Sequence, residues 1–280
     1  MCLDCGKNFQ SSKRPDRLEQ VIFDKYVTKR QTLKNLAQEY GKSVNWVRSK
    51  IETAKALKKE VQADGYVFAA DCTFFGRAYG FIVFRALEIK KNVYVKALMY
   101  ESVADYQRGR MTIQKLGFKI KAIVLDGRPG VRNLFSDVPV QMCHFHQKQI
   151  IQRYLTLRPK LEASIELKAI TDNLTSTTEQ KFTDDFNAWC DKWSDFLKER
   201  TVNPITKKWS YTHKRVRSAR HSIKTNLPFL FTYLKYSGLN IPNTTNALEG
   251  SFSWLKQDVN IHRGMTRQLR DKIIEHILTT

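Results

Sequence analysis

The sequence predicts a mixed α/β fold that is preceded by a small helical domain and interrupted by a helical insertion. From residue 61 to residue 146, apolar residues alternate with polar ones or form short continuous runs, as in strands, whereas the flanking segments repeat at helical spacing. The 280 residues are enough to bury a full core. A formal net charge of +21, from 48 Lys and Arg against 27 Asp and Glu, indicates a polyanionic partner.

Composition also argues against several classes of protein. The chain has no run of 18 apolar residues that could cross a membrane, and its first residues lack the apolar segment of a signal peptide. Its five cysteines, an odd number spread along the chain, do not indicate a disulfide framework. We therefore expect a cytoplasmic protein without membrane attachment, and nucleic acid rather than an anionic membrane surface as its partner.

Residues 1–12 begin with the motif Cys2-x-x-Cys5-Gly, which is half of a zinc ribbon. Tetrahedral zinc needs four ligands, and no second cysteine pair follows this one. The segment is therefore either a truncated zinc-ribbon half, with an incomplete zinc half-site, or simply two unliganded cysteines. The sequence favours the second interpretation.

Residues 13–60 predict three short helices in a helix-turn-helix arrangement. Asp16 is placed to cap the first helix, Gly41 provides the turn, and Ser43 caps the following basic helix. An ordinary helical hairpin is the alternative, but the basic last helix favours entry into a DNA major groove. The outward-facing candidates for DNA contact are Ser43, Asn45, Trp46, Arg48 and Lys50.

The next segment predicts a sheet whose element order is that of a ribonuclease H-like core. Expected strands cover residues 66–74, 79–89, 93–100, 120–126 and 138–143, and a helix over 102–116 crosses between the third and fourth strands. In that topology the first and fourth strands are neighbours. We expect the core to span 61–146 and 240–280, with an all-helical insertion over 147–239.

Three carboxylates are the candidate catalytic residues. Asp71 and Asp126 each follow an apolar strand-like run, and Glu249 lies near the start of a predicted helix. Carboxylate oxygens suit Mg²⁺ or Mn²⁺, and three of them from separate elements can hold two ions for phosphoryl transfer. One ion would activate a water or a 3′-hydroxyl, and the other would stabilise the leaving oxygen.

Each acid also has an ordinary structural explanation. Asp71 could bond the backbone that follows it, Asp126 precedes a glycine in a common turn dipeptide, and Glu249 could close a capping box with Asn246. For each acid taken alone, its structural explanation is sufficient. The three acids together, with the order of elements and the basic charge, favour a catalytic site.

Cys143 and His146 form a second constellation, a Cys-x-x-His pair directly after the predicted fifth strand. With Cys2 and Cys5 they would complete a Cys₃His zinc set. Nothing in the sequence brings the N-terminal residues to this point, so a packed cysteine beside a hydrogen-bonded histidine is the favoured interpretation.

The order of these motifs resembles that in DDE transposases of the Mutator-like superfamily, and most of all its bacterial insertion-sequence type, which begins with a zinc-binding ribbon. The resemblance runs from Cys2 to the end of the chain and is most specific over residues 241–250. The matching motifs are Asp71, Asp126-Gly127, Cys143-x-x-His146, Thr245-Asn246-x-x-Glu249 and His262-Arg263-Gly264.

The resemblance implies a ribonuclease H-like core with an all-helical insertion before the last acid. It implies Asp71, Asp126 and Glu249 as magnesium or manganese ligands. It also implies an active-site signature that organises DNA nearby, made of Cys143, His146 and Asn246. This chain departs from the pattern in one respect, because only the second half of the ribbon is present.

A basic segment in the insertion interleaves cations with aromatic residues between 207 and 221. Such a pattern suits a DNA backbone with stacking on exposed bases, although a solvated helix face is the alternative. We expect DNA contacts from this segment and from one residue of the C-terminal motif: Lys207, Lys208, Lys214, Arg215, Arg217, Arg220 and Arg263.

These inferences predict an enzyme of DNA transposition and recombination. It would cleave the transposon ends and then join the freed 3′-hydroxyl to target DNA, both steps being in-line phosphoryl transfers. The expected partner is double-stranded DNA, bound by a homodimer or higher oligomer associated with the nucleoid. Two alternatives stay open: an inactive transposase remnant or DNA-binding regulator, and a metal-dependent nuclease without strand transfer.

Overall fold

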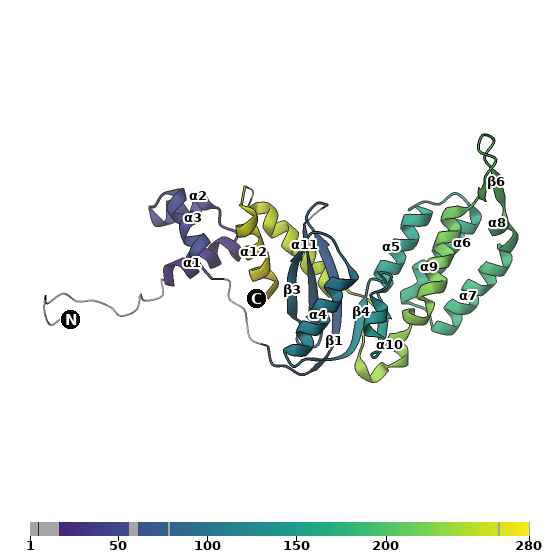
Figure 1. Cartoon of the computed structure of the whole chain (residues 1–280), viewed down its shortest axis with the longest axis horizontal. Coiled ribbons are helices and arrows are strands. Elements are labelled where there is room, and N and C mark those ends of the chain that lie inside the picture. Colours follow the sequence, from purple (N-terminus) through teal and green to yellow (C-terminus); the bar gives the residue numbers. More distant parts are fainter. Residues whose placement is uncertain (1–4, 6–16, 56–60, 78, 263, 280) are drawn as a thin grey trace. The chain divides into compact units, whose positions relative to one another are not determined.

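The structure is a computed structural model that describes residues 5, 17–55, 61–77, 79–262 and 264–279 (Figure 1). The chain divides into two compact units, one formed by Met1–Lys59 with Ser253–Thr280 and the other by Glu60–Phe252. The division falls within helix α11 (Asn246–Ile261). Among the described residues, no helix is both long and apolar enough to span a membrane.

The first unit contains three short N-terminal helices, α1 (Arg17–Val27), α2 (Leu33–Tyr40) and α3 (Val44–Thr53). Thr32 caps α2 through a reciprocal pair of bonds with Asn35, and Gly41 ends it with a left-handed φ of 59°. Ser43 then caps α3, because its side chain accepts a hydrogen bond from the backbone N–H of Trp46. These local signals fix both helix ends close to the positions that the sequence predicts.

The C-terminal helix α12 (Arg267–Thr279) packs in this same unit. We expected residues 240–280 to belong to the core with the sheet, and the structure differs from that expectation. The apolar face of α12 is buried against α1–α3, and Lys272 donates hydrogen bonds to the carbonyls of Ile51 and Glu52 at the end of α3. The shared core consists of Ile22, Phe23, Tyr26, Val27, Leu36, Val47, Ile51, Ala54, Leu269 and Ile273.

The second unit is built on a mixed five-stranded sheet, so the predicted mixed α/β class is confirmed. The strand order is β3-β2-β1-β4-β5, with β2 antiparallel to both β1 and β3, and β4 parallel to both β1 and β5. The strands are β1 (Gly65–Phe74), β2 (Gly80–Ala86), β3 (Lys91–Leu98), β4 (Lys119–Leu125) and β5 (Val140–Met142). The expected neighbourhood of the first and fourth strands is present.

Helix α4 (Val103–Lys115) crosses from β3 to β4 and packs against β2, β3 and β4 (Figure 1). Ser102 caps it in a reciprocal arrangement with Asp105. A Cβ at position 109 would lie 2.4 Å from the ring of Phe84, so glycine is what allows the helix to approach the sheet this closely. A short 3-10 turn, η1 (Arg132–Phe135), packs Phe135 into the same hydrophobic core as α4.

The insertion follows β5 and contains helices α5 (His144–Leu155), α6 (Glu162–Asp172), α7 (Glu179–Lys192), α8 (Ser194–Lys198), α9 (Lys214–Leu230) and α10 (Thr232–Lys235), with 3-10 turns η2 (Asn173–Thr175) and η3 (Ser237–Leu239). The expectation that it is all-helical is wrong. A hairpin of β6 (Arg200–Val202) and β7 (Trp209–Tyr211) interrupts it. The side chain of Asn203 accepts hydrogen bonds from two backbone N–H groups of the loop, which favours a turn over a helix.

Candidate active site and nucleic-acid surfaces

Asp71 and Asp126 lie on neighbouring parallel strands at the same edge of the sheet. Ala69 of β1 pairs with Val124 of β4, and each acid lies two residues beyond its paired residue. Asp71 still belongs to β1, whereas Asp126 directly follows the last residue of β4. Because side chains alternate between the faces of a sheet, equal offsets place both carboxylates on one face.

Asp71 lies in a buried environment with other negative charges nearby. Its side chain is almost buried, at 7% exposure, and its Oδ1 accepts a hydrogen bond of 2.7 Å from the backbone N–H of Cys72. Burial, followed by the nearby charges of Asp126, Glu249 and Glu101, raises the pKa of Asp71 to about 8. The charges of Asp126 and Glu249 therefore act on Asp71.

Glu249 is in the first turn of α11 and is oriented by the residue that precedes the helix. The hydroxyl of Thr245 donates a 2.9 Å hydrogen bond to Glu249 Oε1, and that hydroxyl also lies 3.2 Å from Cys143 Sγ. The backbone N–H of Thr245 donates to the same sulfur at 3.3 Å. A backbone hydrogen bond also joins the start of α5 to the residues before α11: the N–H of His144 donates to the carbonyl of Asn243 at 2.8 Å.

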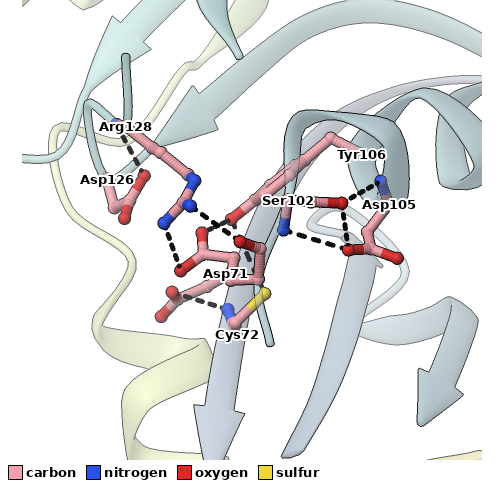
Figure 2. A network of polar contacts seen from close by, with 8 residues as sticks. Asp71, Cys72, Ser102, Asp105, Tyr106, Asp126 and Arg128 are labelled. Carbon is pink, nitrogen blue, oxygen red and sulfur yellow. Dashed lines mark hydrogen bonds and ion pairs between the residues drawn. The ribbon is translucent and has the colours of Figure 1, made fainter. Parts of the chain in front are cut away.

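Sequence reasoning missed a polar network beside the aspartates (Figure 2). The backbone N–H of Arg128 donates to Asp126 Oδ1 at 3.0 Å, and its guanidinium binds both the carbonyl and, at 3.1 Å, the carboxylate of Glu101. The hydroxyl of Tyr106 donates to the other oxygen of Glu101 at 2.8 Å. Burial raises the pKa of Glu101, and Asp126 adds to that effect. Glu101 immediately precedes the cap of α4, a position at a strand-to-helix junction that could have marked it.

The ordinary structural roles considered for the acids are partly present. Asp71 does bond the following backbone, and Asp126 does close a turn through the N–H of Arg128. Glu249 bonds to Thr245, and Asn246 is exposed at the first position of α11. These local bonds fix each carboxylate while the fold brings the acids together, so the two interpretations do not compete.

The donor types of Asp71, Asp126 and Glu249 are those that a divalent metal ion such as magnesium prefers. Carboxylate oxygens are the donors that Mg²⁺ and Mn²⁺ prefer. Burial, and after it the charges of Asp126 and Glu249, raise the pKa of Asp71, and a cation bound nearby would oppose that rise. The zinc half-site predicted at the N-terminus falls only partly within the described residues. Cys2 lies outside the described residues, and Cys5 is exposed and free.

The predicted groove-facing residues of α3 differ in their surroundings. Asn45 and Arg48 are exposed, whereas Ser43 is engaged as the helix cap. Trp46 is half-buried and packs near the ring of Tyr40. Lys50 forms a 3.1 Å ion pair with Glu19 of α1, which reduces the charge that it presents to a partner.

The basic segment of the insertion forms an open cleft of ≈ 460 Å³ between α5, β7 and α9. Arg217 donates to the carbonyl of Leu197 and stacks over the ring of Tyr211 at 3.5 Å, while Arg215 donates to the carbonyl of Arg153. The cleft is lined by Tyr154, Tyr211, Lys214, Arg217, Ser218, Arg220, His221, Ser222 and Lys224. Lys207 and Lys208 are exposed in the hairpin loop, and Arg263 lies outside the described residues.

Comparisons with known proteins add little to this description. No protein-family model matches the chain, and no curated protein matches it. Among solved structures it is similar to a chain of the simian T-cell lymphotropic virus intasome in complex with the PP2A regulatory subunit B56 gamma. That likeness has 10% sequence identity, covers 67% of this chain and 72% of the other, and has a TM-score of 0.24. A TM-score this low does not bear on fold or function.

Proposed function

We propose that this protein is a DNA transposase, which cleaves DNA at transposon ends with divalent metal ions and joins the 3′-hydroxyl to target DNA. The observation that carries the proposal is the placement of Asp71 and Asp126 at one edge of the sheet by strand register, with the charge of Glu249, from a third element, acting on Asp71. A regulator that only binds DNA has no need to collect carboxylates whose mutual repulsion destabilises its fold.

Two further features support the proposal. The strand order β3-β2-β1-β4-β5 is the one expected of a ribonuclease H-like core, in which the acids at the ends of β1 and β4 are neighbours. The capped helices α2 and α3, separated by Gly41, are what a helix-turn-helix would have. The sequence resemblance to Mutator-like DDE transposases joins these features into one assignment.

Asp71, Asp126 and Glu249 would hold the two Mg²⁺ or Mn²⁺ ions. When bound, such ions activate the attacking oxygen and stabilise the leaving oxygen of an in-line displacement. The chain itself orients the acids. The register of β1 and β4 positions the two aspartates, and the hydrogen bond from Thr245 orients Glu249. In cleavage, water attacks the phosphorus and the 3′-oxygen leaves. In joining, that 3′-oxygen attacks a phosphorus of the target, whose own 3′-oxygen leaves.

Positive surfaces would bring double-stranded DNA to this cluster. Asn45 and Arg48, which are exposed on α3, would read a groove, and the cleft beside α9 would follow a phosphate backbone. Bringing two transposon ends together would require a homodimer or higher oligomer on DNA. A cytoplasmic protein associated with the nucleoid is the corresponding setting.

An assay of strand cleavage and joining tests the proposal. The purified chain is incubated with DNA that carries the sequences flanking its gene, in Mg²⁺, in Mn²⁺ and in EDTA. Nicks and joined products that need metal are the expected result. Metal-dependent nicks without joining would instead identify a nuclease, and specific binding without nicks would identify a remnant or regulator.

A further inference from the structure

We infer that Cys143, His146 and Glu249 form a binding site for one zinc-class cation, and that an ion there withdraws Glu249 from the magnesium site. The second clause rests on the proposed function, and the first does not. The three residues come from the start of α5 and the first turn of α11. They offer one sulfur, one ring nitrogen and one carboxylate oxygen, all within 4.8 Å of one another.

The spacing of the donor atoms is close to what zinc needs. Donors at about 2.0–2.3 Å from a tetrahedral ion lie roughly 3.3–3.8 Å from each other. His146 Nδ1 is already 3.8 Å from Glu249 Oε1. A contraction of about 1 Å in the widest pair would therefore complete the ligand set.

The two helices hold these ligands in place. Cys143 precedes the first residue of α5 and His146 is its third residue, and positions three apart lie on the same side of a helix. Thr245 fixes the third ligand relative to the first, since it bonds both Cys143 Sγ and Glu249 Oε1. The three donors are thus held near one another before any ion arrives, so binding needs only a small rearrangement.

His146 provides an independent sign that a ligand position is incomplete. Among the described residues, its Nδ1 atom is buried without a hydrogen-bond partner, because 3.8 Å from Glu249 is too long for a hydrogen bond. A buried polar atom without a partner costs free energy. Coordination of a cation by Nδ1 would remove that cost.

The donor types select the ion. A thiolate and an imidazole favour zinc and its neighbours over magnesium, which prefers oxygen alone. One thiolate and one carboxylate also neutralise a divalent charge, and the thiol proton is released to solvent on binding. Three protein ligands leave a fourth position for water.

Cobalt absorption tests the site directly, because Co²⁺ replaces zinc and shows both its geometry and its sulfur ligand. The full-length protein is used with Cys2→Ser and Cys5→Ser, so that the N-terminal cysteines cannot contribute. We expect one equivalent of Co²⁺ to give tetrahedral ligand-field bands and a sulfur-to-cobalt charge-transfer band. Cys143→Ser should lose the charge-transfer band, and His146→Asn and Glu249→Gln should weaken binding at least about 10-fold.

Matched variants separate this site from other cysteines and from the magnesium site. Cys72→Ser and Cys190→Ser should leave the cobalt bands unchanged, and so should Asp71→Asn and Asp126→Asn. Because Cys143 is buried, far-UV circular dichroism checks that its variant is folded, and the more exposed His146→Asn is an independent test. Absence of cobalt bands, or bands that survive both His146→Asn and Cys143→Ser, would overturn the proposed site.

Competition is measured by thermal melting, which needs no catalytic activity. Mg²⁺ should raise the melting temperature, and one equivalent of Zn²⁺ should greatly reduce that Mg²⁺-dependent rise in the parent protein but not in His146→Asn. If zinc binds while the magnesium response stays intact, the withdrawal of Glu249 is wrong. If cobalt binds but no DNA is ever cleaved, the zinc-class site stands and the transposase proposal alone fails.

Discussion

Asp71 and Asp126 occupy equivalent positions on two neighbouring parallel strands, each two residues beyond the paired residues Ala69 and Val124. Their proximity is therefore a property of strand register. A slip of one residue in either strand would turn its acid to the opposite face of the sheet. The register of β1 and β4 is the feature that any metal chemistry in this protein depends on.

Removal of any one acid should abolish catalysis and spare DNA binding. We expect Asp71→Asn, Asp126→Asn and Glu249→Gln each to lower the rate of strand cleavage by at least about 1,000-fold, roughly 4 kcal/mol of transition-state stabilisation. Cleavage of end-labelled DNA and a mobility-shift assay on the same samples measure the two properties. Full cleavage activity in one variant would remove that residue from the metal site.

The metal-free protein should become more stable when the charge at position 71 is removed. Asp71 is buried beside other carboxylates, and asparagine keeps the oxygen that accepts from Cys72. We expect Asp71→Asn to raise the free energy of unfolding by on the order of 2 kcal/mol in EDTA. Mg²⁺ should stabilise the parent protein against urea and have little effect on the variant.

A surface carboxylate provides the control for that experiment. Asp195→Asn changes an exposed acid on α8 and should alter neither stability nor the magnesium response. If Asp71→Asn is less stable than the parent in EDTA, burial and the neighbouring carboxylates do not disfavour the ionised Asp71 as described.

Thr245 should act as a positioning residue for Glu249. Replacing it with valine keeps the shape of the buried side chain and removes the hydroxyl that links Cys143 and Glu249. We expect Thr245→Val to lower the maximal cleavage rate about 10-fold to 100-fold, with little change in the DNA concentration for half-maximal rate. Thr245→Ser keeps the hydroxyl and should restore most of the rate; equal losses in both variants would contradict this role.

Arg48 should contribute more to DNA affinity than Lys50, although both are basic residues on the same helix. Arg48 is exposed, whereas Lys50 is paired with Glu19. We expect Arg48→Ala to reduce the slope of log affinity against log salt by about one, the effect of one lost phosphate contact. Lys50→Ala should change the slope less. Salt-dependent fluorescence anisotropy tests the ranking, which fails if the two variants behave alike.

Stability should fall in mild acid because of a buried histidine in the first unit. His276 is 3% exposed and packs on Phe23, and burial lowers its pKa from the usual 6.5. Above pH 6.5 both the folded and the unfolded states keep the ring neutral. Below it the unfolded state takes up a proton first, so the free energy of unfolding decreases as the pH falls from 6.5 toward 5.

Thermal melting of the His276→Gln variant checks this dependence. Asp24 faces the ring from α1 and favours its protonation, while Lys272 on α12 opposes it. Glutamine does not titrate, so the variant should lose less stability than the parent over that pH interval. An identical decrease in both proteins would assign the acid sensitivity to other groups.

Local sequence signals predicted most of the secondary structure near the candidate site. Strand alternation and the caps Ser43 and Ser102 place the elements within a few residues of their observed bounds. The positions of Asp71 and Asp126 followed from the expected neighbourhood of two strands, which the sheet order confirms. Such local patterns can be read from the sequence because each depends on residues that are close together along the chain.

Features that depend on distant parts of the chain were not predicted. Glu101 and Arg128 are related to the acids only by the folded loops that bring them together, and the pairing of Lys50 with Glu19 depends on how α1 packs on α3. The hairpin of β6 and β7 has strands of three residues, too short for a period to be recognised. The place of α12 was missed because amphipathic spacing shows that a helix has a partner but does not identify it.

The hydrogen bond between the N–H of His144 and the carbonyl of Asn243 has a consequence for the evolution of this fold. It joins the start of α5 to the segment just before α11, so the insertion from α5 to η3 begins and ends at neighbouring points. Such an insertion can lengthen, shrink or be exchanged between relatives while the residues that follow β5 stay joined to those that precede α11. The surface that would meet DNA and the acids that would cut it can therefore change at independent rates.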